Sequence, residues 1–428
     1  MGTAVDLFWL ILRTGMYIFL NPLFWGVLVL IYFQTRSTVR REEEVYNLQP
    51  RGRKAVLKRL LNSGLYGVIG GFLGSIIFVV VGVTLSDIGI GYLWLVAILG
   101  LLINVRFLCF SYAGGIVGLS SIILGWPEVN VAAILMIVAV LHLIESILIQ
   151  LSGGEKPLPL TVAHPEEGRV GLFLLQKLWP IPFVALIALA VMESEVPGAV
   201  IDMPDWWPLI DTLIEIGSGE TVMYILLPVA AGLGYGDMAV TSRPREKARH
   251  TARRLFGYSI VLLLLALSGS YFPPVLLVGA LFSFLGHEKV IRTGRKVEQK
   301  GSPLYTPPRE GLLILGVLED YPADEAGLKR GDILLAADGM VFQSPALFYE
   351  YCRDQSRIVL EVRNRENFAE SEAQGNQGVR EVIFDSSTGD LGLVFLSDRP
   401  EQRMSDLTER SGYLPRLLSR LKNRFFSS

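Results

Sequence analysis

The sequence is poor in the residues that usually build redox and metal centres, with two cysteines and four histidines among 428 residues. Cys109 lies in an apolar run and Cys352 in a polar segment, so we expect no structural disulfide between them. Two cysteines are also too few for a zinc site built on cysteine. We therefore predict a protein with no metal site and no cofactor.

The sequence also lacks a complete catalytic motif. His287-Glu288 begins like the zinc motif H-E-x-x-H, but Ile291 stands where the second histidine is required. No G-x-S-x-G motif of a serine hydrolase occurs. We therefore predict that the protein is not an enzyme. His287-Glu288 is interpreted as a polar helix end at the membrane edge, with His164 and His250 in loops.

Long apolar runs dominate the chain up to about residue 286 and account for a mean hydropathy of +0.44. A helix needs about 20 apolar residues to cross a bilayer. We predict a polytopic α-helical membrane domain over residues 1–290 with about seven to nine spans. Leu7–Leu20 is expected to lie in the interface or to re-enter, because Asn21-Pro22 breaks the run. The candidate spans are Pro22–Phe33, Gly64–Leu85, Ile88–Val105, Phe107–Gly125, Val131–Leu151, Leu172–Met192, Thr221–Val240, Leu255–Ser270 and Phe272–Gly286.

The placement of charge predicts the orientation of these spans. Segments 34–63 and 241–254 are rich in Lys and Arg, whereas segment 193–220 is acidic and has neither. Because cytoplasmic loops carry the excess of positive charge, the basic segments should be cytoplasmic and the acidic one external. The C-terminal domain then lies in the cytoplasm. The net charge of −2 gives no indication of nucleic-acid binding.

Polar and small residues within the apolar runs have two interpretations each. His142 and Glu145 share one helix face, either as an interhelical hydrogen-bonded pair or helix-end pair, or as a proton relay or ligand site. Gly64–Gly74 and Gly114–Gly118 are small-residue stripes that favour close helix packing. Pro228 with Gly232, Gly234, Gly236 and Asp237 marks the place where a transporter would hold its substrate.

After a linker over residues 291–309, the pattern changes to short strands and turns. It predicts a strand in Gly311–Glu319, a helical turn at Ala323–Ala326, a strand at Ile333–Ala337, a helix at Pro345–Cys352 and a strand at Arg357–Arg363. The run resembles the bacterial PDZ signature A-G-L-x-x-G-D followed by a D-G turn, which implies a small α+β PDZ domain over residues 310–398. The signature residues are Ala326, Gly327, Leu328, Gly331, Asp332, Asp338 and Gly339.

The PDZ resemblance implies a peptide bound as an added strand, with its terminal carboxylate held by a Φ-G-Φ loop. The best match is Leu391-Gly392-Leu393 followed by Val394, which requires a circularly permuted order, and Leu315-Gly316-Val317 is the alternative. Leu347 and Phe348 are expected to line the groove or to belong to the core.

Two further segments carry predictions. Asn367–Gly378 is interpreted as a flexible insertion, and residues 399–428 as a basic amphipathic tail, either on the inner leaflet or solvated.

Many spans followed by one cytoplasmic PDZ domain form an architecture that is similar to the MinJ family of Gram-positive rod-shaped bacteria. The resemblance implies a non-enzymatic membrane scaffold for division-site selection by the Min system. It also implies DivIVA-like and MinD-like partners and enrichment at septum and poles. The alternatives are a regulatory PDZ protein linked to envelope proteolysis or secretion, an inactive relative of a site-2-type protease, and a transporter.

Overall fold

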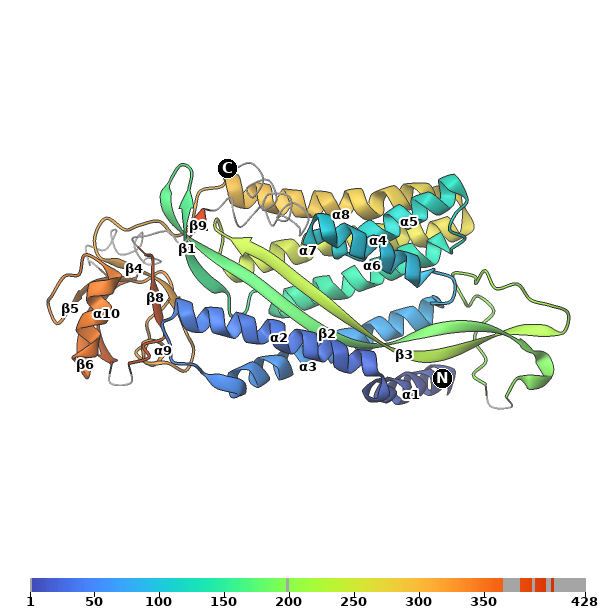
Figure 1. Cartoon of the computed structure of the whole chain (residues 1–428), viewed down its shortest axis with the longest axis horizontal. Coiled ribbons are helices and arrows are strands. Elements are labelled where there is room, and N and C mark those ends of the chain that lie inside the picture. Colours follow the sequence, from blue (N-terminus) through green and yellow to red (C-terminus); the bar gives the residue numbers. More distant parts are fainter. Residues whose placement is uncertain (1, 198–199, 365–377, 387–388, 398–401, 404–428) are drawn as a thin grey trace, which may run out of the picture.

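The computed structural model describes residues 2–197, 200–364, 378–386, 389–397 and 402–403. The predicted insertion, apart from Gly378, and the predicted tail, apart from residues 402–403, lie outside these ranges. Figure 1 shows a long region of helices crossed by a β-hairpin, with the C-terminal domain at one end. The ends of β2 (Gly168–Met192) and β3 (Glu220–Ala239) that flank the acidic segment lie at the opposite end.

Eight α-helices of 14 to 30 residues form the apolar region within the described residues. In the part of the chain that the structure describes, four of these helices are long and apolar enough to cross a membrane, or five if α1 and α2 form one bent span. That number is below the prediction, because two predicted spans are strands and α4 and α5 are short. The helices are α1 Gly2–Met16, α2 Pro22–Val45, α3 Gly52–Val81, α4 Ile90–Ile103, α5 Phe110–Leu124, α6 Val131–Leu148, α7 Pro244–Tyr271 and α8 Pro274–Lys300.

The predicted break before α2 is confirmed. The axes of the flanking helices differ by 69°. The Asn21 side chain accepts a hydrogen bond from the Leu23 amide at 2.9 Å, and Pro22 occupies the first position of α2. Asparagine as N-cap followed by proline favours a new helix start over continuation of the preceding one.

The prediction of helical spans at Leu172–Met192 and Thr221–Val240 is wrong. These runs form β2 and β3, which pair antiparallel from Phe173↔Ala239 to Met192↔Glu220. The order of the sheet is β3-β2-β1-β9, with β1 at Leu158–His164 and β9 at Gln402–Arg403. Pro180 and Pro182 in β2 each cost about 3 kcal/mol inside a helix, so this run is better suited to a strand. Apolar content alone does not distinguish the two conformations.

Helix α3 packs directly against β2 through two glycines. An ideal Cβ on Gly67 or Gly71 would lie 1.9 Å from the carbonyl oxygen of Pro180 or Pro182, respectively. The small-residue stripe was expected to pack against helices, and on this face it packs against a strand. Gly70, on another face, lies against Ile144 of α6 as expected.

Further along β2, side chains and loop backbone complete the hydrogen bonds of the strand. The Val184 amide donates to Ser75 Oγ at 2.8 Å, and the Ala188 amide donates to Ser86 Oγ at 2.9 Å. Between them, the Leu186 carbonyl accepts from the Leu85 amide at 2.8 Å. These contacts supply partners to the edge of β2 that faces away from β3.

The C-terminal domain has a five-stranded sheet in the order β7-β6-β5-β4-β8. Every element predicted for it is confirmed, with boundaries shifted by at most a few residues. The elements are β4 Leu312–Val317, α9 Pro322–Glu325, β5 Ile333–Ala337, α10 Pro345–Arg353, β6 Arg357–Arg363, β7 Val379–Asp385 and β8 Leu393–Phe395.

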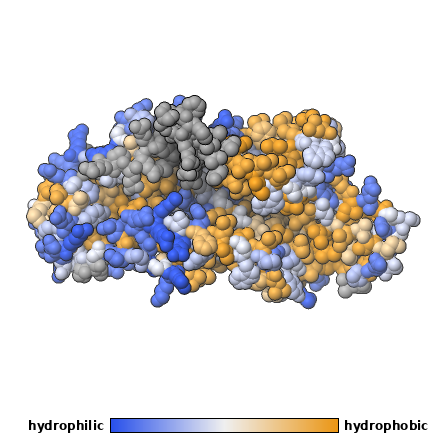
Figure 2. Space-filling view, in the orientation of Figure 1, coloured by the Kyte–Doolittle hydropathy of each residue, from blue (hydrophilic) through white to orange (hydrophobic). Residues whose placement is uncertain are grey.

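The surface divides along the long axis of the molecule. Figure 2 shows hydrophobic residues over the helical region and hydrophilic ones over the end that carries the C-terminal domain. Large apolar side chains such as Leu30, Leu65 and Ile123 are more than half exposed. A water-soluble domain rarely exposes so extensive an apolar surface.

The contact between α3 and β2 gives a first prediction. Gly67→Ala or Gly71→Ala should destabilise the protein by about 1–3 kcal/mol, because the new methyl group meets backbone that cannot move aside. Thermal unfolding of the detergent-purified protein measures the effect. Gly64→Ala is the matched control, since a Cβ there meets nothing within 4 Å. Equal melting temperatures for all three variants would contradict this packing.

Candidate peptide-binding site

The predicted signature residues hold the turns of the C-terminal domain. Gly327 and Gly331 have φ of +74° and +94°, which favour glycine. The buried Asp332 carboxylate accepts from the Lys329 amide at 3.0 Å and from the Arg380 guanidinium at 2.8 Å. Arg380 also donates to the Gly327 carbonyl at 2.9 Å. These residues therefore join the α9–β5 turn to β7, while Ala326 and Leu328 pack with the core.

The Asp338-Gly339 turn is fixed in the same way. Both residues have positive φ, +48° and +75°. The Asp338 carboxylate accepts from the Val359 amide and from the Tyr351 hydroxyl, each at 2.8 Å. Because the Tyr351 hydroxyl donates to this carboxylate, the pKa of Tyr351 is raised. The turn thereby links β5, β6 and α10.

The segment around Gly392 leads into the edge strand of the sheet. β8 pairs antiparallel with β4 although it follows β7 in the chain, which is the permuted order that the sequence predicted. The Leu391 and Gly392 carbonyls accept from the Ala323 and Leu318 amides at 3.2 and 2.8 Å. The competing segment Leu315-Gly316-Val317 forms the end of β4 inside the sheet. Leu391–Leu393 therefore leads into the edge strand β8, whereas Leu315–Val317 lies within the sheet.

A cavity of about 180 Å³ lies between β8 and α10. On its β8 side the Tyr349 hydroxyl donates to the Leu393 carbonyl at 2.8 Å. The Ser397 amide, just beyond β8, donates to Thr161 Oγ1 of β1 at 2.9 Å. The cavity is thus walled by the C-terminal domain and by elements of the helical region, and its lining is Val45, Pro159, Leu160, Thr161, Pro345, Tyr349, Val394, Phe395 and Ser397.

The predicted groove residues are only partly brought to this cavity. Val394 lines it, whereas Leu391, Leu393 and Phe348 belong to the buried core of the domain. Leu347 is 51% exposed and does not line the cavity. The residues that α10 presents to this cavity are Pro345 and Tyr349. Pro345 and Tyr349 are four residues apart and so lie on one face of α10, beside the core residue Phe348. This spacing was the signal that sequence reasoning missed.

An apolar cluster docks the C-terminal domain on the helical region. It includes Tyr46 and Phe173 from the helical region and Leu313 and Leu315 from β4. The Arg330 guanidinium lies 4.5 Å from the centre of the Phe173 ring. Such cation–π contacts contribute about 0.5–2 kcal/mol.

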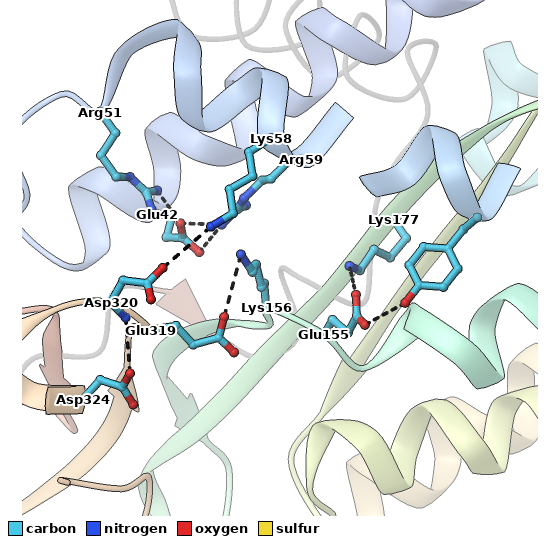
Figure 3. Close-up of polar contacts among 11 residues, drawn as sticks. Glu42, Arg51, Lys58, Arg59, Glu155, Lys156, Lys177, Glu319, Asp320 and Asp324 are labelled. Atoms are coloured by element: carbon cyan, nitrogen blue, oxygen red, sulfur yellow. Dashed lines mark hydrogen bonds and ion pairs between the residues drawn. The ribbon is translucent and has the colours of Figure 1, made fainter. Parts of the chain in front are cut away.

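Charged residues surround this docking surface (Figure 3). The buried Glu42 carboxylate of α2 pairs with Arg51 and Arg59 of the following segment. The exposed pairs Lys58–Asp320 and Lys156–Glu319, at 3.7 and 3.9 Å, reach across to the C-terminal domain. Exposed pairs of this kind contribute about 0–1 kcal/mol, so the apolar cluster carries the attachment.

Of the predicted intramembrane pair, His142 contacts a residue outside its own helix. His142 lies 3.1 Å from Cys109 Sγ, and among the described contacts no hydrogen bond joins it to Glu145. His287 was expected at the membrane edge and lies inside α8, buried and facing the same cysteine. His250 lies in α7 and His164 at the end of β1, so neither is in a loop.

The comparisons with known proteins agree with this architecture. The PDZ domain family matches residues 313–364. The cell division topological determinant MinJ of Bacillus subtilis (strain 168) is 22% identical over 91% of this chain and 96% of its own length. The mitochondrial serine protease HTRA2 of Bos taurus is 35% identical over 15% of this chain and 14% of its own. No solved structure matches the chain.

Fold and comparisons together define a protein with several apolar helices and a C-terminal PDZ domain, a module that binds other proteins. Within that class, the predicted resemblance to MinJ is confirmed over nearly the whole chain.

The turn at Gly392 gives a second prediction. Gly392→Ala should destabilise the PDZ domain by about 1–3 kcal/mol, because the new Cβ would lie 2.3 Å from Tyr321 Cβ. Gly389→Ala is the matched control, since it has the same positive φ but open space around it. Hydrogen exchange of β4 and β8 amides reports the difference. Equal protection in both variants would contradict the close approach.

Proposed function

We propose that this protein is a non-enzymatic membrane scaffold of cell division that recruits partner proteins through a cytoplasmic PDZ domain. The observation that carries the proposal is the similarity to a cell division topological determinant along 91% of the chain. By the resemblance to MinJ, its role is in division-site selection by the Min system, with DivIVA-like and MinD-like partners at septum and poles.

The proposed membrane placement rests on the helices and on charge. Four or five helices have the length and hydropathy of a span, and their outer side chains are apolar. The basic segments between α2 and α3 and at the start of α7 lie at the same end as the PDZ domain (Figure 1). The positive-inside rule then orients that end toward the cytoplasm and the acidic segment outward.

The proposed binding mode is strand addition at β8. The outer edge of this strand faces α10 across the cavity, so an extended peptide can pair with β8 and place a side chain beside Pro345 and Tyr349. The Tyr349 hydroxyl already donates a hydrogen bond to the Leu393 carbonyl. An incoming peptide amide therefore has to displace this hydroxyl, which makes Tyr349 an internal competitor for the groove.

The alternative of a protein linked to envelope proteolysis has narrower support. The similarity to the serine protease covers 65 residues. A match of this length is no longer than one PDZ domain. PDZ domains occur in scaffolds and in proteases alike. The scaffold is therefore the proposal that accounts for the whole chain.

Localisation tests the proposed cellular role. A fluorescent fusion of the full-length protein, expressed in its own host, should gather at septa and poles, because the proposed partners mark division sites. A deletion strain should misplace septa. Uniform membrane fluorescence together with normal septum placement in the deletion strain would contradict the proposal.

Peptide affinity tests the groove. Tyr349→Phe should bind a peptide with a free C-terminus about two- to tenfold more tightly, because one hydrogen bond of about 0.5–1.5 kcal/mol no longer competes. The probe is a fluorescent peptide selected from a random library on the full-length protein. Its C-terminally amidated form should bind weakly.

The control for this test is Tyr351→Phe on the same helix, whose hydroxyl bonds Asp338 away from the groove. It should leave the affinity unchanged. Weaker binding by Tyr349→Phe, or equal binding of the amidated peptide, would count against strand addition at β8.

A further inference from the structure

Three metal-binding side chains from distant parts of the chain converge within the helical region. Cys109 precedes α5, His142 lies in α6 and His287 in α8. One ligand atom from each lies within 4.8 Å of the others. Cys109 Sγ is 3.1 Å from His142 Nε2 and 3.9 Å from His287 Nε2. Two ligands on a tetrahedral Zn²⁺ ion are separated by about 3.6 Å, given Zn–S near 2.3 Å and Zn–N near 2.05 Å.

The protonation of His142 suits coordination. Its Nδ1 lies 2.7 Å from the Val138 carbonyl oxygen. A carbonyl only accepts hydrogen bonds, so Nδ1 carries a proton, and in the neutral imidazole the lone pair of Nε2 then points to the cysteine. Histidines that bind metals are commonly held in this way, with the second ring nitrogen donating to a backbone carbonyl.

His287 provides the second observation. It is 9% exposed, and its Nδ1 has no hydrogen-bond partner among the described residues. No hydrogen bond at Nδ1 among the described residues therefore offsets the cost of burying this imidazole. Its neighbour Glu288 is fully occupied, accepting from Tyr112 and Arg292 at 2.6 Å and from Arg106 at 3.1 Å. The other ring nitrogen of His287, Nε2, is the one that faces Cys109 Sγ.

The cysteine has the setting of a thiolate ligand. Cys109 is the N-cap of the 15-residue helix α5, where the helix dipole stabilises a negative charge. The Tyr112 and Tyr258 rings pack edge-on against His287, and Tyr258 also contacts His142. These ring contacts hold both imidazoles in orientation, and His142 and His287 are buried while Cys109 is half-buried.

We propose that Cys109, His142 and His287 form a binding site for Zn²⁺. One thiolate and two imidazoles are a donor set that zinc accepts, and three protein ligands leave a fourth position for water or a small ligand. The bound ion would tie α5, α6 and α8 together within the apolar region. The expectation of no metal site counted cysteines and looked for two histidines on one helix, so it did not consider ligands from three segments.

Metal content tests the site directly. The full-length protein in detergent is stripped with a chelator, loaded with Zn²⁺ and freed of excess metal, and zinc is then measured by mass spectrometry. The wild type should retain one Zn²⁺ per chain. Cys109→Ser, His142→Gln and His287→Gln should each weaken binding about tenfold or more. His250→Gln, an exposed histidine of α7, is the control that should retain the metal.

Cobalt substitution detects the thiolate ligand in the wild-type protein itself. Co²⁺ bound by wild type should show a thiolate-to-cobalt charge-transfer band, which Cys109→Ser lacks and His250→Gln keeps. Cys352 does not interfere, because it is 2% exposed and burial raises the pKa of its thiol to about 12. Well-folded wild type that retains no zinc, or that binds Co²⁺ without the thiolate band, would overturn the proposal.

Discussion

Satisfaction of backbone hydrogen bonds along β2 is the constraint on which the rest of the structure depends. β3 pairs with one edge of this strand from Phe173 to Met192, but β1 covers the other edge only from Gly168 to Leu174. Beyond that point, an unpaired amide in apolar surroundings would cost several kcal/mol. Pro180 and Pro182 have no amide hydrogen that needs a partner. The amides of Val184 and Ala188 donate to Ser75 and Ser86. Helix α3 must therefore lie against this edge.

The same hairpin connects the apolar helices to the PDZ domain. At about 3.3 Å per residue, the 25 residues of β2 extend for roughly 80 Å, longer than any of the described helices. Near its start, Phe173 packs under Arg330. The neighbouring strand β1 supplies Thr161 to the wall of the cavity proposed as the peptide groove. Position and shape of the groove are thus set partly by residues outside the PDZ domain.

Sequence reasoning succeeded where local chemistry decides the conformation. In the PDZ domain, glycines at positive φ and the Asp338 turn are determined by neighbouring residues, so elements such as β5 and β6 were predicted to the residue. It failed at β2 and β3, because an apolar run satisfies the requirements of a buried helix and a buried strand alike. The two prolines of β2 were the available signal. Whether Leu347 or Tyr349 lines the cavity depends on which face of α10 meets β8. The packing of Phe348 in the core determines that face.

The cysteine–histidine cluster and the peptide groove are built from separate elements. The former uses α5, α6 and α8, and the latter uses β8, α10, β1 and the end of α2. Since no helix or strand carries residues of both, a ligand at one site changes the other only through the packing between them. The cluster lies among helices whose interfaces hold the apolar region together. A bound ion would therefore first make the helical region that carries the PDZ domain more rigid. The proposed recognition of a peptide would remain with β8 and Tyr349.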